Sequence, residues 1–301
     1  MQDQIQIAKR RVAFFTGLLL IFTLAASLLA ARIQASPISS LFMMWTPALA
    51  AFVASLVTHR PFREIGWSLR PVKWLALAWF IPILYGFIAY VPLWLTGLGA
   101  VPNPTFLERA RLTLNLTTGS DTSVIFAAFG FITVVNLLPS MFFSLGEEIG
   151  WRGFLVPELS KWMSIRKAGL LSGLIWSVWH LPGILGADYH TEGTPLAYQL
   201  ACFFLMVISG GMIFAWVRMK SGNVWSAVIL HAVHNNVIQA FFDRITTDTG
   251  YTRYFVGEFG LALSLATLIL AIVLWRKLGE QEITKKGNSR VGLIGWSAIK
   301  R

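Results

Sequence analysis

Apolar stretches long enough to cross a lipid bilayer recur along most of the chain, and they restrict its fold more than any other feature. A membrane-spanning helix needs about 20 predominantly apolar residues. Eight windows approach that length: 12–31, 41–58, 75–95, 124–145, 168–186, 196–217, 224–242 and 256–275. Because backbone groups in lipid must be satisfied within the protein, the predicted fold class is all-α, a polytopic membrane bundle of about eight transmembrane helices.

The composition agrees with that interpretation. The 301 residues are 55% hydrophobic and 13% charged, whereas soluble domains carry about 25% charged residues. The first apolar run, from Val12 to Ala31, is longer than the roughly 7–15 residues of a signal-peptide core. We therefore interpret it as an uncleaved first span.

The formal net charge of +11 would suit a nucleic-acid partner, but the placement of the charges argues against one. Basic residues gather beside the ends of apolar runs, where they set orientation and meet anionic lipid headgroups. The connections after the second, fourth and sixth windows are the basic ones, with Arg60, Arg63, Arg70 and Lys73, then Lys161, Arg166 and Lys167, then Arg218 and Lys220. Both termini are basic as well, so the positive-inside rule predicts that both lie in the cytoplasm.

Two carboxylates and a guanidinium interrupt the fourth apolar window. Charges at that depth are costly unless paired, and they mark functional sites. Glu148 and Arg152 are four residues apart and share a helix face, which predicts a buried ion pair. Glu147 is rotated by about 100° from Glu148 and is expected to gain no such partner from its own helix. Glu147 is therefore predicted to be the carboxylate available for acid–base chemistry.

Imidazole and amide groups occur in two later windows. His180 lies near the end of the fifth, and the seventh carries His231 and Asn235 on one helix face, with His234 close to that face. Asn235 can donate to a developing oxyanion, and His231 can relay a proton, donate a hydrogen bond or bind a metal. His234 and Asn236 are interpreted as supporting or packing groups.

The depths of these groups give a further expectation. Under the predicted topology, Glu147, His180 and His231 lie roughly 10–18 Å below the cytoplasmic surface. They are therefore expected to meet in one cavity that opens to the cytoplasm. Glu258 precedes the last apolar run and is expected to face the outer interface.

These residues resemble the CPBP family of intramembrane proteases, which includes CAAX prenyl endopeptidases and bacteriocin-processing or immunity proteins. The family pattern has three parts, which stand here as Glu147-Glu148…Arg152, Trp176…His180 and His231…Asn235. The resemblance covers about 124–242. Trp176 departs from the pattern, since phenylalanine often occupies this position, and little effect is expected because either ring can line a cavity.

The resemblance implies an endopeptidase in which Glu147, assisted by His180, activates water while His231 and Asn235 stabilise the oxyanion. Glu148, Arg152, Trp176 and His234 would support them. Glu147, His180 and His231 also suit a zinc site of the His₂Glu type, although the resemblance fits a metal-free mechanism slightly better. The implied substrate is a membrane-associated peptide or a lipidated protein.

Two other functions remain open at this point: a non-catalytic immunity or scaffold protein that binds a peptide or membrane partner, and a proton-coupled transporter. In each case residues 1–301 are interpreted as one membrane domain, with the catalytic core at 124–242 and a polar cytoplasmic tail at 276–301. The expected location is a multi-pass position in a cell membrane, a bacterial plasma membrane in preference to the endoplasmic reticulum of a eukaryote.

Overall fold

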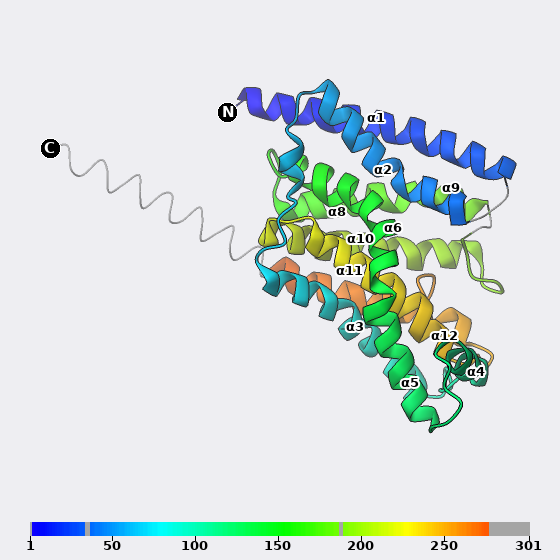
Figure 1. Cartoon of the computed structure of the whole chain (residues 1–301). Helices are drawn as coiled ribbons and strands as arrows, with labels where there is room; N and C mark the ends of the chain where they lie inside the picture. Colours follow the sequence, from blue (N-terminus) through cyan, green and yellow to red (C-terminus); the bar gives the residue numbers. More distant parts are fainter. Residues whose placement is uncertain (1, 34–36, 187–188, 277–301) are drawn as a thin grey trace.

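The computed structural model describes residues 2–33, 37–186 and 189–276. The predicted tail at 276–301 lies outside these residues, apart from Arg276. Within the described ranges the chain is helical, and its one isolated β-bridge joins Ala100 to Thr247 (Figure 1). The predicted class, an all-α polytopic membrane protein, is confirmed.

Five helices are long and apolar enough to cross a membrane, and a bent pair makes a sixth candidate. The five are α1 (Gln2–Ile33), α2 (Pro37–Val57), α3 (Val72–Leu95), α8 with α9 (Ile165–Trp179, Leu181–Leu185) and α10 (Leu196–Ser221). The bent pair consists of Asp121–Val135 and Leu137–Leu159, which meet at 44°. The short helix α4 (Pro104–Thr113) precedes it.

The other two predicted windows also fold as helices, but with different character. The seventh contains α11 (Trp225–Asn235), a π-helical segment (Asn236–Phe242) and α12 (Asp243–Ile245). This segment can carry histidines and an amide because the side chains of His231, His234 and Asn236 are buried in the protein interior. The eighth becomes Leu261–Arg276, a shorter apolar helix. It starts later than predicted because the chain turns before it, with Gly257 at a φ of 72°.

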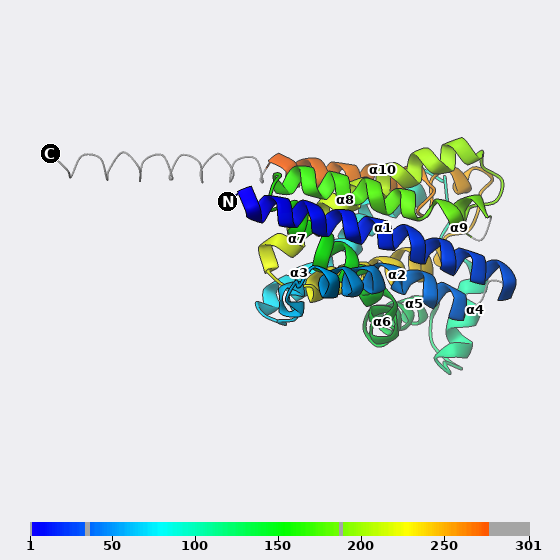
Figure 2. The ribbon, with the colours of Figure 1, turned by 90° about the horizontal axis from the view of Figure 1, so that it is seen from above.

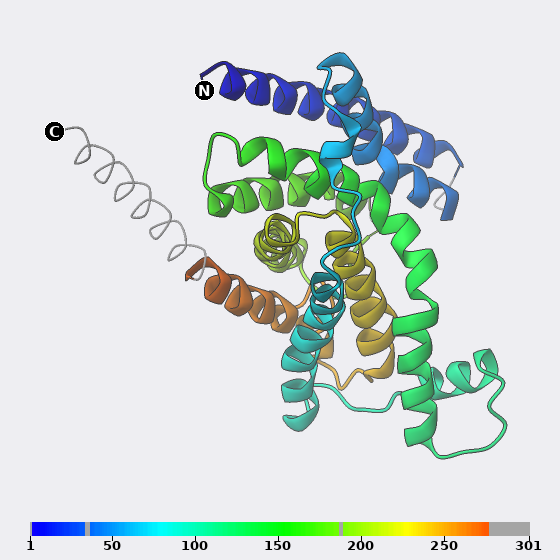
Figure 3. The same cartoon turned by 60° about the vertical axis from the view of Figure 1, so that its left-hand side comes forward.

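The bent span changes direction at Asn136, between the π-helical segment Phe131–Val135 and α6 (Leu137–Glu148), which follows α5 (Asp121–Gly130). The side chain of Asn236 holds this bend. Its Oδ1 accepts hydrogen bonds from Asn136 Nδ2 (3.2 Å) and Ser140 Oγ (2.6 Å), and its Nδ2 donates to the Ile132 carbonyl (2.9 Å). Figure 3 shows this span, in green, along the flank of the bundle. Asn236 is therefore a packing residue, as predicted.

Close backbone contact fixes α8 against α10, which run side by side in Figures 1 and 2. A Cβ atom on Gly173 would lie 2.8 Å from Ile208 Cα, and one on Gly211 would lie 2.5 Å from Gly173 Cα. Small residues allow such approach between membrane helices. The contact sets the position of the residues at the end of α8, including Trp176 and His180.

The bundle has a basic end and an opposite end, here called the far end. At the basic end, Glu158 of α7 (Val156–Leu159) receives Arg60 Nε at 2.8 Å and Lys161 Nζ at 2.7 Å. Burial lowers the pKa of Arg60, and its acidic neighbours Glu158 and Glu64 oppose that shift. The lysines and arginines grouped there are Lys9, Arg10, Arg11, Arg60, Arg63, Arg70, Lys73, Lys161, Arg166, Lys167, Arg218, Lys220 and Arg276.

The far end consists of the loops at 96–103, 189–195 and 246–260. The backbone amide of Ala100 donates to Thr247 at 3.1 Å, and a Cβ on Gly193 would touch the Arg253 side chain. In Figure 1 the beginning of α1 and the end of the last helix lie on the same side of the bundle, opposite α4 and α12. The alternation of basic and less basic loops in the sequence thus corresponds to two physical ends.

Candidate active site

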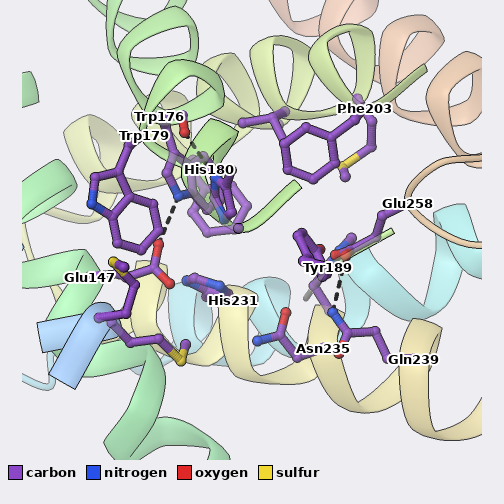
Figure 4. Close-up of a pocket in the computed structure, with 18 of the residues that line it drawn as sticks. Glu147, Trp176, Trp179, His180, Tyr189, Phe203, His231, Asn235, Gln239 and Glu258 are labelled. Carbon is purple, nitrogen blue, oxygen red and sulfur yellow. Dashed lines mark hydrogen bonds and ion pairs between the residues drawn. The ribbon is translucent and has the colours of Figure 1, made fainter. Parts of the chain in front are cut away.

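All four residues predicted to be catalytic line one cavity of about 400 Å³. Glu147 comes from the end of α6, His180 follows the last turn of α8, and α11 supplies His231 and Asn235. Figure 4 shows His231 between Glu147 and Asn235 along the cavity. Three helices that are separate in sequence thus bring together the groups predicted to meet.

The ion pair predicted from the spacing of Glu148 and Arg152 is present and fully buried. Arg152 Nη1 lies 3.0 Å from Glu148 Oε1, and both side chains have zero exposure. The rings of Trp176 and Phe214 each lie 4.3 Å from the Arg152 guanidinium carbon. Such contacts add cation–π attraction to the ion pair, and this attraction offsets part of the free-energy cost of burying the guanidinium.

The π-helical segment that carries Arg152, Ile149–Leu155, is held by two further arginines. Arg60 Nη2 donates to the Gly153 carbonyl (3.0 Å), and Arg218 Nε donates to the Arg152 carbonyl (2.8 Å). These side chains satisfy backbone acceptors of the irregular turn. The position of the Glu148–Arg152 pair therefore depends on residues from two other parts of the chain.

Glu147 has hydrogen-bond partners that the sequence analysis did not expect. Its Oε2 accepts from Trp176 Nε1 at 2.7 Å and from Trp151 Nε1 at 3.2 Å. The prediction that its own helix offers no counter-charge is not contradicted, because Trp151, one turn later, donates through a neutral indole N–H. No cation among the described residues pairs with Glu147, and its Oε1 accepts no hydrogen bond from them.

Trp176 has its expected place and a further role. Its ring lines the cavity, as expected of either aromatic residue. Its N–H also makes the shorter of the two contacts to Glu147, and a phenylalanine has no such donor.

His180 is fixed in one tautomer by its environment. Its Nδ1 lies 2.8 Å from the Trp176 carbonyl oxygen. Because a carbonyl can only accept, Nδ1 must carry the hydrogen, and the assignment follows from this contact. In the neutral ring Nε2 then has a free lone pair, which can accept a proton.

His231 contacts Glu148 and not Glu147. Its Nδ1 lies 2.9 Å from Glu148 Oε1, the oxygen that also receives Arg152. When Glu148 is ionised, Nδ1–H donates to it, and Nε2 can donate in turn only if the imidazole is protonated. Glu148 therefore orients His231 as well as pairing with Arg152, a second role that the spacing of the sequence did not indicate.

Asn235 and its neighbour His234 have different surroundings. Asn235 is half-buried on the cavity wall, and within the described parts of the chain its carboxamide has no hydrogen-bond partner. His234 is buried and bonds to Tyr85 and Glu258. The carboxamide of Asn235 is thus available to a ligand, whereas both ring nitrogens of His234 already have partners.

The described residues do not assemble a metal site. Within 2–33, 37–186 and 189–276, no three His, Cys, Asp or Glu side chains lie together so that they could hold a metal ion. The predicted zinc alternative of Glu147, His180 and His231 is not formed in this structure.

The cavity extends towards the far end of the bundle, contrary to expectation. Beyond the four candidate groups its wall includes residues in or beside the far-end loops, namely Ala30, Ser39, Gly183, Tyr189 and Glu258. None of its lining residues belongs to the loops of the basic end. The predicted opening on the basic side is therefore wrong, because the relevant halves of α8 and α11 are the ones nearer the far end.

Glu258 was expected to face the outer interface, and this is also wrong. Its residue exposure is 8%, and it lines the cavity with Tyr85 and Gln239. Tyr85 belongs to α3 and Glu258 to the turn before the last helix, outside the matched motifs. Their contacts join distant parts of the chain, so no local spacing in the sequence could reveal them.

Comparison with known proteins supports the same core of the chain. Residues 122–237 match the family model described as type II CAAX prenyl endopeptidase Rce1-like. An alignment of 114 residues is 32% identical to CAAX prenyl protease 2 of Methanococcus maripaludis, and it covers 35% of this chain and 42% of that protein. All eight predicted site residues, from Glu147 to Asn235, fall within the matched segment, whereas Tyr85, Gln239 and Glu258 lie outside it.

Proposed function

Because its residues 122–237 make this chain a member of the Rce1-like CAAX prenyl endopeptidase family, a family of peptidases, we propose that it hydrolyses a peptide bond of a membrane-associated or lipidated substrate within the helical bundle. The observation that carries the proposal is the convergence of Glu147, His180, His231 and Asn235 on one cavity. An immunity or scaffold function would need the cavity but not this set of acid–base groups.

In the proposed reaction a water molecule sits between Glu147 Oε1 and His180 Nε2, two acceptors that have no hydrogen-bond partner among the described residues. Glu147 removes a proton as the water oxygen attacks the carbonyl carbon of the scissile bond. The carbon–nitrogen bond then breaks, and the proton held by Glu147 passes to the leaving amine. The hydrogen bonds from the Trp151 and Trp176 indoles to Oε2 hold the carboxylate so that Oε1 faces the water.

The carbonyl oxygen becomes negative in this step and needs hydrogen-bond donors. Asn235 supplies an amide N–H, and His231 supplies Nε2–H in its protonated form. Glu148, 2.9 Å from His231 Nδ1, stabilises that imidazolium. This arrangement resembles the way a buried carboxylate orients a catalytic histidine in other hydrolases.

Trp176→Phe is expected to lower kcat by about 10- to 100-fold with little change in KM, because it removes a hydrogen bond of about 1.5–3 kcal/mol to a charged group. The measurement is peptide cleavage by purified protein in detergent. Trp79→Phe is the matched control, since it removes an indole hydrogen bond to the Thr133 carbonyl (3.0 Å) away from the cavity. Equal activities of the two variants would contradict the positioning role of Trp176.

We also propose that the helices Trp225–Ile245 and Leu261–Arg276 complete eight spans, with both termini and the basic end in the cytoplasm of a bacterial cell. The cavity would then extend towards the outer leaflet. In a Cys202→Ser background, Thr118→Cys should react with an impermeant maleimide on intact cells, and Ser68→Cys only after permeabilisation. Both positions are exposed, and the reverse labelling pattern would overturn this orientation.

A further inference from the structure

A second polar cluster lies in the same cavity, at a distance from the candidate catalytic groups. Here it is called the Glu258 cluster, and it consists of Tyr85, His234, Gln239 and Glu258. Glu258 Oε1 contacts His234 Nε2 at 2.8 Å, and Oε2 contacts Gln239 Nε2 at 3.1 Å. Tyr85 Oη lies 2.6 Å from His234 Nδ1. Figure 4 shows Glu258 and Gln239 beyond Asn235, on the side away from Glu147.

The hydrogen-bond partners of Glu258 are neutral groups when Tyr85 donates to His234. His234 then carries its hydrogen on Nε2 and donates to Glu258, as does the Gln239 amide. Within the described residues no lysine or arginine forms an ion pair with Glu258. A buried carboxylate without a counter-charge is unfavourable, and burial raises the pKa of Glu258 to about 8, so a ligand cation beside it would stabilise its ionised form.

Aromatic side chains surround the space beside the carboxylate. Tyr189, Phe203 and Phe259 pack against one another, with ring centroids 5.0–5.7 Å apart, and the first two line the cavity. An aliphatic chain would pack on these rings while its charged head reached Glu258, the pattern typical of lysine and arginine side chains.

We propose that the Glu258 cluster is a binding subsite for the ammonium or guanidinium group of a basic residue in the substrate. The peptide part of this inference rests on the proposed function. Gln239 follows His231 by eight residues, or about 12 Å along a helix, which corresponds to three or four residues of extended peptide. The basic residue of the substrate therefore lies about three or four residues from the scissile bond.

A binding measurement tests the subsite without requiring cleavage. The probe is n-hexylamine, compared with 1-hexanol, and the readout is the melting temperature of the full chain in detergent. Hexylamine at saturation should raise Tm by about 2–4 °C more than hexanol does. Glu258→Gln should abolish that difference, whereas Glu192→Gln, which changes an exposed acid at the far end, should preserve it.

A second variant covers the case in which Glu258→Gln does not fold. Gln239 is exposed as a residue, so Gln239→Lys should fold and place an ammonium next to Glu258. It should raise Tm without ligand and remove the response to hexylamine. Equal effects of hexylamine and hexanol on the wild type, or an unchanged amine response in either variant, would overturn the proposal.

A cleavage series then locates the basic residue. Peptides carry lysine or norleucine at each of four positions on either side of the scissile bond. The wild type should cleave one lysine peptide at least tenfold faster than its norleucine counterpart, and Glu258→Gln should lose the preference while cleaving the norleucine peptide. A lack of any cleavage with an intact hexylamine effect would count against the proposed function and leave the subsite standing.

Discussion

Glu147→Gln is expected to reduce peptide cleavage by about 10²- to 10⁴-fold, the usual contribution of a positioned general base. Glutamine has the size of glutamate, and its carbonyl oxygen can still accept from Trp176, so the fold should be retained. An amide cannot take a proton from water at neutral pH. The measurement is mass spectrometry of peptide products from wild type and variant, with melting temperatures recorded for both.

Glu108→Gln provides the control, because Glu108 is an exposed acid on α4 and should leave the rate unchanged. Cleavage by Glu147→Gln within threefold of the wild-type rate would remove Glu147 from the role of base. The same assay with a strong chelator examines the zinc alternative directly. Loss of activity with recovery on adding zinc would favour ligation by Glu147, His180 and His231 over the metal-free mechanism.

The second large effect concerns stability. Arg152→Ala is expected to destabilise the protein by about 3–5 kcal/mol, since removing one partner of a buried pair leaves the other charge uncompensated. Here the group left behind is Glu148, which has zero exposure and would keep only His231 as a partner. The substitution also removes the guanidinium that packs between Trp176 and Phe214. Thermal unfolding in detergent measures the loss.

Arg111→Ala is the matched control for that experiment. Arg111 Nη2 lies 2.8 Å from Asp121 Oδ1, a shorter contact than the 3.0 Å of the buried pair, but both side chains are solvent-accessible. Exposed pairs contribute about 0–1 kcal/mol, so Arg111→Ala should change Tm little. Equal losses in the two variants would show that burial of the Glu148–Arg152 pair does not determine its contribution.

Local spacing was sufficient to predict part of the site. Residues four apart on a helix share a face whatever the tertiary structure, so the Glu148–Arg152 pair and the common face of His231 and Asn235 followed from the sequence alone. The class of fold followed equally from the apolar windows. These predictions depend only on helix geometry and on the cost of burying polar groups.

Other features depend on contacts between distant segments and were missed. The hydrogen bond from Trp176 to Glu147 joins α8 to α6, and the contact of His231 with Glu148 joins α11 to α6. Glu258 reaches the cavity only because the chain turns before the last helix. The direction of the cavity was mispredicted for a related reason, since depth in a helix does not tell which end of the bundle the space between helices reaches.

Trp176 has a hydrogen-bonding role that the family pattern does not indicate. Replacing the usual phenylalanine by tryptophan conserves an aromatic ring, which is why the sequence suggested little consequence. The indole nitrogen nevertheless adds a donor at 2.7 Å from the carboxylate predicted to act as base. For this contact the relevant difference between the two residues is the indole N–H donor, which a pattern that asks only for an aromatic ring does not report.

The double attachment of Glu148 has a consequence for genetics. One carboxylate oxygen contacts both Arg152 and His231, the histidine that we propose takes part in the reaction. Loss of function caused by a substitution of Glu148 can therefore result from a smaller amount of folded protein, from a defect in the reaction, or from both. Phenotypes at this codon become interpretable only when the amount of folded enzyme is measured in the same cells.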